Sequence, residues 1–257
     1  VVKFMQKYIF IRKKAYFCTY LKSYFHFMSC ILNIDTSTDV CSVAVSRDGE
    51  CLLNKEDHCG PNHAVRLGSF IDEALSYIDT RSIPLDAVAV SCGPGSYTGL
   101  RIGVSMAKGI CYGRGAKLLA VPTLELMAVP VLLGHDELDD DTLLCPMLDA
   151  RRMEVYAGIY DRALREVRGV QADVVDGDTY KEYLERGTVC FFGNGACKCF
   201  DIINHPNARL IKGVEPLAKN MMPLAEKRMA EGRFEDVAYF VPFYLKDFVA
   251  KTPKKLL

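Results

Sequence analysis

The 257-residue sequence lacks any apolar run long enough to span a membrane. It also lacks the paired cysteine spacing of a structural zinc site. Its eleven cysteines are scattered, and Cys197 and Cys199 lie too close together to form half of one. Lone cysteines in a chain of this size are typical of reduced thiols in the cytoplasm. We therefore expect a cytoplasmic protein with no membrane segment and no metal site.

A net charge is absent as well, because 32 Lys and Arg residues balance 32 Asp and Glu residues. The balance is uneven: residues 1–30 hold six cations and no carboxylate, so the remainder has six negative charges in excess. A mildly acidic body gives no electrostatic reason to expect strong, direct nucleic-acid binding. Charges interrupt every apolar run in residues 1–27, which excludes a signal peptide. We interpret residues 1–27 as a basic N-terminal extension outside the folded unit, with a basic amphipathic membrane anchor as the alternative.

The most distinctive stretch is the glycine-rich segment 91–103, Ser-Cys-Gly-Pro-Gly-Ser-Tyr-Thr-Gly-Leu-Arg-Ile-Gly. It follows a strand-like run and opens an apolar helix. Ser96 and Thr98 are suited to cap that helix, whose free N–H groups would attract an anion. The segment lacks the closing Gly-Lys-Ser/Thr of a Walker loop and the glycine spacing of a dinucleotide fingerprint. Two interpretations follow, a phosphate cradle and a well-capped strand-turn-helix junction.

The order of periodic segments predicts an α/β protein whose architecture is duplicated. Three strands with tight turns precede alternating helices and strands. After the polar stretch 135–141 the pattern partly restarts, again with a strand ending in Asp. We expect a first domain at 28–133 completed by a helix at 215–232, a second, smaller domain at 134–214 and a C-terminal arm at 233–257. The expected strands are 30–35, 40–45, 51–55, 85–91, 117–121, 143–148, 154–160, 166–172 and 188–192, and the other expected helices are 62–80, 98–113, 179–186 and one that begins near 122.

The helix at 98–113 is apolar on two sides, because Leu100 and Ala107 lie on one side and Ile102 and Met106 on another. A helix that covers a sheet needs one apolar stripe, so something must cover the second side. Helix 62–80 of the same chain is one alternative, and a protein partner is the other. The partner interface that we expect from these two helices comprises Leu67, Phe70, Ile71, Ala74, Leu100, Ile102, Gly103, Met106, Ala107 and Ile110.

Four segments together resemble one known family. Residues 31–38 read Ile-Leu-Asn-Ile-Asp-Thr-Ser-Thr and are followed by Cys-Ser-Val-Ala at 41–44. Residues 93–103 carry the glycine-rich hallmark, 149–156 read Asp-Ala-Arg-Arg-Met-Glu-Val-Tyr and 242–245 read Pro-Phe-Tyr-Leu. In this order, over about residues 29–257, the sequence is similar to the TsaB (YeaZ) family of tRNA threonylcarbamoyladenosine biosynthesis proteins. The basic N-terminus falls outside the resemblance.

The resemblance implies an actin/Hsp70/sugar-kinase architecture: two ribonuclease-H-like domains with mixed five-stranded sheets flanked by helices. It also implies a non-catalytic partner that binds and activates TsaD, which transfers threonylcarbamoyl to adenosine 37 of tRNA. The ATPase subunit TsaE joins that complex. We further expect a homodimer when the chain is isolated, tRNA contact only through the complex, and no cofactor of its own. ATP or ADP with Mg²⁺ is expected, if at all, at the complex interface.

Two enzymatic alternatives remain at the sequence level. A metal-dependent glycoprotease would need a His-x-x-x-His pair, but His58 and His63 are five residues apart with Gly-Pro between them, which favours one loop residue and one helix-start residue. An independent actin-like ATPase would use Asp35 near magnesium, although an Asx turn explains the same residue. The nucleotide-binding candidates are Asp35, Thr36, Ser37, Gly93, Gly95, Ser96, Asp149, Arg151, Gly193 and Gly195. With no catalytic set assembled, we interpret the glycine-rich motif chiefly as the anchor of a partner-binding helix.

Overall fold

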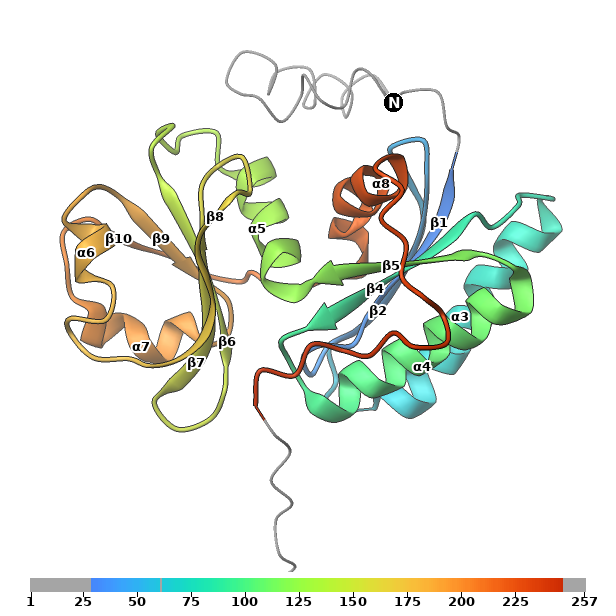
Figure 1. Ribbon diagram of the computed structural model, residues 1–257, viewed down its shortest axis with the longest axis horizontal. Coiled ribbons are helices and arrows are strands. Elements are labelled where there is room, and N and C mark those ends of the chain that lie inside the picture. Colours follow the sequence, from blue (N-terminus) through green and yellow to red (C-terminus); the bar gives the residue numbers. More distant parts are fainter. Residues whose placement is uncertain (1–28, 61, 247–257) are drawn as a thin grey trace, which may run out of the picture.

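The computed structural model describes residues 29–60 and 62–246, which form two units, each built on a five-stranded sheet (Figure 1). The basic extension expected at residues 1–27 lies outside the described residues. No helix in the described ranges is both long enough and apolar enough to cross a membrane.

The first sheet has the strand order β3-β2-β1-β4-β5. Strands β1 to β3 are antiparallel neighbours, whereas β4 and β5 run parallel to β1. Alternate residues of β1 face opposite layers: Leu32 and Ile34 pack with α3 and α4, and Ile31 packs with α5 and α8. The elements are β1 (Cys30–Asp35), β2 (Cys41–Arg47), β3 (Glu50–Asp57), α3 (His63–Thr80), β4 (Ala87–Gly93), α4 (Tyr97–Arg114), β5 (Lys117–Pro122), α5 (Thr123–Gly134) and α8 (Met222–Ala230).

The second sheet repeats this design with the strand order β10-β9-β6-β7-β8. Its first three strands along the chain, β6, β7 and β8, are antiparallel, and β9 and β10 follow parallel to β6. Both sheets therefore have the ribonuclease-H-like order, as expected from the sequence. The elements are β6 (Leu143–Asp149), β7 (Glu154–Tyr160), β8 (Glu166–Val174), α6 (Lys181–Leu184), β9 (Val189–Phe192), α7 (Ala196–Ile203) and β10 (Ala208–Ile211).

Helix α5 lies between the two units and, apart from its first turn with Glu125, is apolar around its circumference (Figure 1). Leu126 and Val129 pack in the core of the first sheet. Leu124, Met127 and Val131 pack with residues of the second sheet. Because both sides are covered, neither side needs polar residues. Helix α5 thus contributes to the cores of both units and joins them.

The structure corrects part of the expected secondary structure. The helix expected at 215–232 is shorter: a 3-10 turn, η2 (Ala218–Asn220), precedes α8. Pro223 lies in the first turn of α8, where its missing N–H costs nothing, and Pro216 precedes an extended Leu217. Helix α7 and strand β10 were not predicted from the sequence, and α6, which spans Lys181–Leu184, is shorter than the helix expected at 179–186. These elements are short, so their periodic signals are weak.

Candidate functional site

The glycine-rich motif forms the turn between β4 and α4. The hydroxyl of Ser96 accepts a hydrogen bond from the backbone N–H of Gly99 at 3.2 Å, which caps the helix as the sequence indicated. Gly93 has φ +112°, a conformation that L side chains rarely adopt. The motif thus turns the chain sharply from the end of a buried strand into α4.

The turn between β1 and β2 packs directly onto α4 through three glycines of the motif. A Cβ at Gly95 would overlap the carbonyl oxygen of Ser37, and one at Gly99 or Gly103 would overlap Thr36. The N–H of Ser96 donates to the carbonyl of Ser37 at 2.7 Å. Gly99 and Gly103 are four residues apart and share one face of α4, and Gly95 lies just before the helix, so this side of the segment has no side chains. The turn at Thr36 and Ser37 occupies that space, with backbone at Gly95 and Gly99 and with the Thr36 side chain at Gly103.

The structure therefore brings six of the nucleotide-binding candidates together. Their own contacts, however, occupy the space in which a phosphate would have to bind. Thr36 donates its hydroxyl to the carbonyl of Gly99 at 2.7 Å, and the Ser96 N–H is already used by Ser37. A Cβ at Gly93 would overlap the carbonyl oxygen of Phe243. A phosphate cradle needs unoccupied N–H groups and open space beside the glycines. At the contacts just described, the turn has neither an unoccupied N–H group nor open space beside its glycines. The six candidates are Asp35, Thr36, Ser37, Gly93, Gly95 and Ser96.

Asp35 is fully buried at the end of β1. Its carboxylate accepts hydrogen bonds from the N–H and hydroxyl of Ser37 at 3.2 Å and 3.0–3.2 Å, the Asx-turn arrangement that the sequence analysis weighed against a magnesium ligand. Burial raises the pKa of Asp35 to about 7, and the hydroxyls of Ser91 and Ser37 partly offset the rise. The position of Asp35 is thus explained by the local turn.

The remaining four nucleotide-binding candidates lie at the ends of β6 and β9 and are arranged in a similar way. The N–H of Gly195 donates to the carbonyl of Met147 at 3.0 Å. The side chain of Asn194 accepts from the N–H of Asp149 at 2.9 Å. A Cβ at Gly193 would overlap Met147, and one at Gly195 would lie 2.8 Å from Leu148. The glycines again allow close packing of one turn on a strand end. The four candidates are Asp149, Arg151, Gly193 and Gly195.

Asp149 is held by a salt bridge to Lys198 and by the N–H of Arg151 at 2.8 Å. Burial alone would raise the pKa of Asp149, but these two partners hold it below its usual value. The guanidinium group of Arg151 is exposed. Asp149 therefore serves the turn between β6 and β7, and the charge of the exposed Arg151 also helps to lower its pKa.

The two histidines that the sequence analysis considered lie in different environments. His58 follows β3 on the surface, between Glu56 at 3.3 Å and Glu215 at 3.1 Å. His63 begins α3, is 4% exposed and contacts the carbonyl of Thr38 through its Nε2 atom at 2.7 Å. They are a loop residue and a helix-start residue, as the sequence indicated. Within the described residues, no group of three or more His, Cys, Asp or Glu side chains is placed to hold a metal ion.

Helices α3 and α4 lie side by side on one face of the first sheet (Figure 1). Most of the residues expected at a partner interface are buried in the chain's own core, so the expectation that all ten form a surface is corrected. Three are only half-buried: Phe70, Ile102 and Met106. The seven buried residues are Leu67, Ile71, Ala74, Leu100, Gly103, Ala107 and Ile110.

Residues 233–246, here called the C-terminal strap, run along α4 on the side of Lys108 (Figure 1). The ammonium group of Lys108 donates to the carbonyls of Ala238 at 3.0 Å and Phe240 at 3.1 Å. Val237 and Phe240 pack on the same core as Ile102. The strap therefore covers the Lys108 flank of α4 with a segment more than a hundred residues away in the sequence. Ile102 and Met106 lie on the other flank of the helix and are half-buried.

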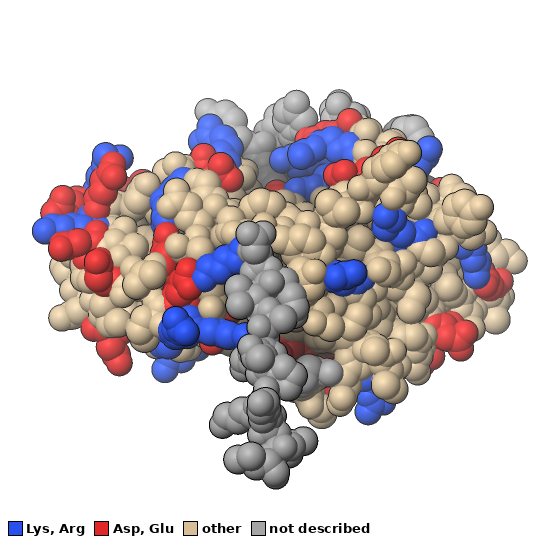
Figure 2. Space-filling view, turned by 60° about the horizontal axis from the view of Figure 1, so that its bottom comes forward, with Lys and Arg blue, Asp and Glu red and all other residues tan. Residues whose placement is uncertain are grey.

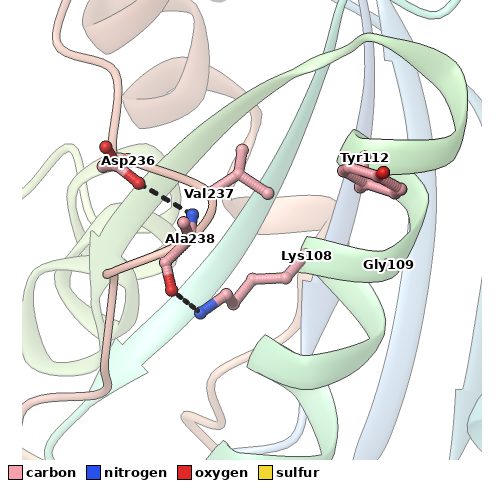
Figure 3. Close-up of a pocket in the computed structure, with 6 residues that line it drawn as sticks. All are labelled: Lys108, Gly109, Tyr112, Asp236, Val237 and Ala238. Carbon is pink, nitrogen blue, oxygen red and sulfur yellow. Dashed lines mark hydrogen bonds between the residues drawn. The ribbon is translucent and has the colours of Figure 1, made fainter.

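A hollow of about 500 Å³ remains between α4 and the strap (Figure 3). Lys108 reaches across it to the strap, and the ring of Tyr112 stands one turn further along α4. Tyr112 is 87% exposed, and Tyr239 of the strap is 84% exposed. We call Phe70, Ile102, Met106 and Tyr112 the outer face of α3 and α4. This outer face has apolar side chains that the described chain leaves wholly or partly uncovered.

Comparisons with known proteins agree on one family. The family model described as "TsaD: tRNA N6-adenosine threonylcarbamoyltransferase" matches residues 57–185. The chain is 31% identical over 233 residues to the tRNA threonylcarbamoyladenosine biosynthesis protein TsaB of Escherichia coli, which covers 88% of this chain and 99% of that protein. It is 35% identical over 130 residues to the TsaB protein of Bacillus subtilis, covering 51% of this chain and 54% of that protein.

A solved structure from Pseudomonas aeruginosa, described as similar to peptidase YEAZ, has the same fold. It superposes with a TM-score of 0.71 at 26% identity and covers 85% of this chain and 100% of that one. A second structure, of YeaZ from the same organism, gives a TM-score of 0.66 at 26% identity with the same coverage. The similarity thus extends over both ribonuclease-H-like units.

Proposed function

Because the chain belongs to the TsaB (YeaZ) family of tRNA threonylcarbamoyladenosine biosynthesis proteins, we propose that it is the non-catalytic partner that binds and activates the TsaD transferase subunit. A role in this tRNA modification follows from family membership. Pairing with TsaD, the joining of TsaE, a homodimer in the absence of TsaD and a cytoplasmic location are the finer parts of the proposal. ATP or ADP with Mg²⁺ would then be bound between subunits rather than by this chain alone.

The observation that carries the proposal is the outer face of α3 and α4. Phe70, Ile102 and Met106 are half-buried, and Tyr112 is 87% exposed, on two adjacent helices. Aromatic residues and methionine are enriched at the centres of protein interfaces. The Cβ-free stripe on Gly95, Gly99 and Gly103 fixes the start of α4 against the turn at 36–37, so the helix is presented in one orientation. A rigid surface loses little entropy on binding.

The arrangement of polar residues supports a non-catalytic role. The carboxyl group of Asp35 accepts a hydrogen bond from Ser37, and that of Asp149 forms a salt bridge with Lys198. Neither carboxylate is placed as a free base or as one of a pair of metal ligands. The activity of the complex would then depend on groups that the partner supplies.

Copurification with TsaD tests the proposal. Met106→Glu and Tyr112→Glu place a charge on the outer face, and we expect each to weaken the pairing at least about tenfold. Tyr112 is so exposed that its substitution leaves the core untouched. Val174→Glu is the matched control, because Val174 is 70% exposed at the end of β8 in the other unit. Pairing of both outer-face variants with the affinity of the wild type would overturn the proposal.

Calorimetry separates this function from the alternative ATPase. Titration of the isolated chain with ATP and Mg²⁺ should give no binding heat, because the turns at 36–37 and 93–96 are filled by their own contacts. Saturable heat that Asp35→Asn abolishes would instead favour a nucleotide site of the chain's own.

A further inference from the structure

The end of the C-terminal strap joins the two units at one edge of the molecule. The ring of Tyr244 lies 4.9 Å from that of Tyr97 at the start of α4. Two residues further on, Lys246 forms a salt bridge with Glu154 of β7 and lies 5.9 Å from the ring of Tyr156. The start of α4 and the turn between β6 and β7 therefore belong to one continuous surface.

This surface, which we call the basic edge, carries more cations than carboxylates. Figure 2 shows several Lys and Arg side chains near the middle of this side of the molecule. Asp149 and Glu154 are each paired with a lysine. The exposed Asp176 lies on the neighbouring loop, where the N–H of Val175 donates to the carbonyl of Met153 at 3.1 Å. Among the described residues, no carboxylate lies within ion-pair distance of Arg101, Arg151 or Arg152. The cations of the basic edge are Arg101, Arg151, Arg152, Lys198 and Lys246.

Arg151 and Arg152 are exposed residues in a turn with an unusual backbone conformation. Both have positive φ angles, 71° and 53°, which cost a residue other than glycine about 1 kcal/mol or more. Lys198 offsets that cost by donating to the carbonyls of Arg152 at 2.7 Å and Glu154 at 2.8 Å. Many other arginines of the chain are used in ion pairs, such as Arg114 with Asp79 at 2.6 Å. The two exposed guanidinium groups at this turn remain free of such partners within the described chain.

Tyrosines lie between these cations. Arg101 lies 5.4 Å from the ring of Tyr97 and donates to its hydroxyl at 2.9 Å. Tyr244 is 38% exposed, and the neighbouring Phe243 is 48% exposed. Guanidinium groups that meet phosphates, beside aromatic rings that stack on unpaired bases, are the chemistry by which proteins hold single-stranded loops of RNA.

We propose that the basic edge binds RNA directly, with Arg151 and Arg152 on phosphates and Tyr244 against an unstacked base. This inference rests on the proposed function, because the RNA would be the tRNA that the complex modifies. It differs from the sequence-based expectation in one respect: the chain itself contributes to holding the tRNA. The acidic excess of the whole body does not oppose this, because the charges at this edge are locally positive and screening limits repulsion from beyond about 10 Å at 0.1 M salt.

The test measures the affinity of unmodified tRNA by fluorescence anisotropy, for the full chain alone and for its complex with TsaD. Arg151→Gln/Arg152→Gln removes two charges while keeping long side chains. We expect about a tenfold loss of affinity at low salt, and a slope of log K against log salt that is smaller by about two. Tyr244→Leu should weaken binding about fivefold or more without changing the slope.

Arg209→Gln/Lys212→Gln is the matched control. Both residues are exposed, without an ion pair among the described residues, and lie at the β10 edge of the second sheet. The control should bind tRNA as the wild type does. If the Arg151/Arg152 variant and the control bind equally well, or if the wild type binds no tRNA in either form, the inference is overturned.

A pull-down distinguishes this failure from failure of the proposed function. Arg151→Gln/Arg152→Gln leaves the outer face of α3 and α4 unchanged, so the variant should pair with TsaD normally. Normal pairing with unchanged tRNA affinity would remove only the RNA inference. Absence of pairing by the wild type would remove the proposed function, and the measurement on the isolated chain would still decide the RNA inference.

Discussion

Thr36 and Gly99 interlock across more than sixty residues of sequence. The hydroxyl of Thr36 donates to the carbonyl of Gly99 at 2.7 Å, and the carbonyl of Thr36 occupies the space that a Cβ of residue 99 would need. The contact joins the turn after β1 to the first turn of α4. It explains why the glycines of the motif are spaced as on a helix face rather than as around a phosphate.

The first prediction concerns this contact. Gly99→Ala should lower the free energy of unfolding by about 2–4 kcal/mol, because the added Cβ would overlap backbone. Gly109→Ala is the control on the same helix. Gly109 has nothing within 4 Å of its added Cβ, so this change should raise stability by about 0.5–1 kcal/mol. Urea unfolding measures both values, and equal effects at the two sites would contradict the interlocking.

The second prediction concerns Asp35 and pH. Its pKa is raised to about 7 by burial, from an ordinary value of 3.8. Well below pH 3.8 the carboxyl is protonated in both states. As the pH rises to 7 only the unfolded state ionises freely, so the wild type loses stability over that window, by up to about 4 kcal/mol. Asp35→Asn should differ least from the wild type at the acidic end of this range, near pH 4, and should exceed it most at pH 8.

Thermal unfolding from pH 4 to pH 8 measures this difference. Asp39→Asn serves as the control, because the side chain of Asp39 is exposed at the same turn. A constant difference between Asp35→Asn and the wild type across the range would show that burial of the charge does not govern stability here.

The third prediction concerns the strap. Lys108→Met removes the donor that serves the carbonyls of Ala238 and Phe240. Global stability should fall by about 1 kcal/mol or less. Hydrogen exchange at the N–H groups of Phe240 and Phe243, which donate to Asp236 and Cys92, should become faster. Lys181→Met, at the exposed start of α6, is the control and should leave the strap unchanged.

The fourth prediction concerns a buried ion pair that joins α5 to α8. Arg228 is 5% exposed and bonds to Glu125 at 2.6 Å. Arg228→Met leaves the carboxylate of Glu125 without its partner, so stability should fall by about 3–5 kcal/mol. The double variant Glu125→Leu/Arg228→Met removes both charges and should recover most of the loss. Additive effects in this double-mutant cycle would mean that the two charges do not depend on each other.

Much of the fold follows from local patterns. Alternating apolar residues define β1 and β2, and Asp48 and Gly49, with φ of 55° and 76°, make the tight turn before β3. The helices α3 and α4 were predicted to within a residue of their ends. Periodicity failed for α7 and β10, which are too short to show it, and prolines shortened the helix expected at 215–232.

The candidate site was less accessible to prediction. The sequence showed that α4 is apolar on two sides, but a helical wheel does not say what covers a side. Seven of the ten expected interface residues are buried in the chain's own core, and the strap runs along the Lys108 side of α4. The basic edge was not predicted, because Arg101, Arg151 and Lys246 are far apart in sequence and the whole body is acidic.

The sequence by itself determined the family, the two α/β units and the order of nearly all their elements, because these depend on local periodicity, turn residues and motifs. Only the tertiary structure decided the role of the glycine-rich motif. Whether a glycine faces a phosphate or another part of the chain depends on what lies beside it, and Ser37, Thr36 and Phe243 reach Gly95, Gly99 and Gly93 through long-range contacts that no local pattern records.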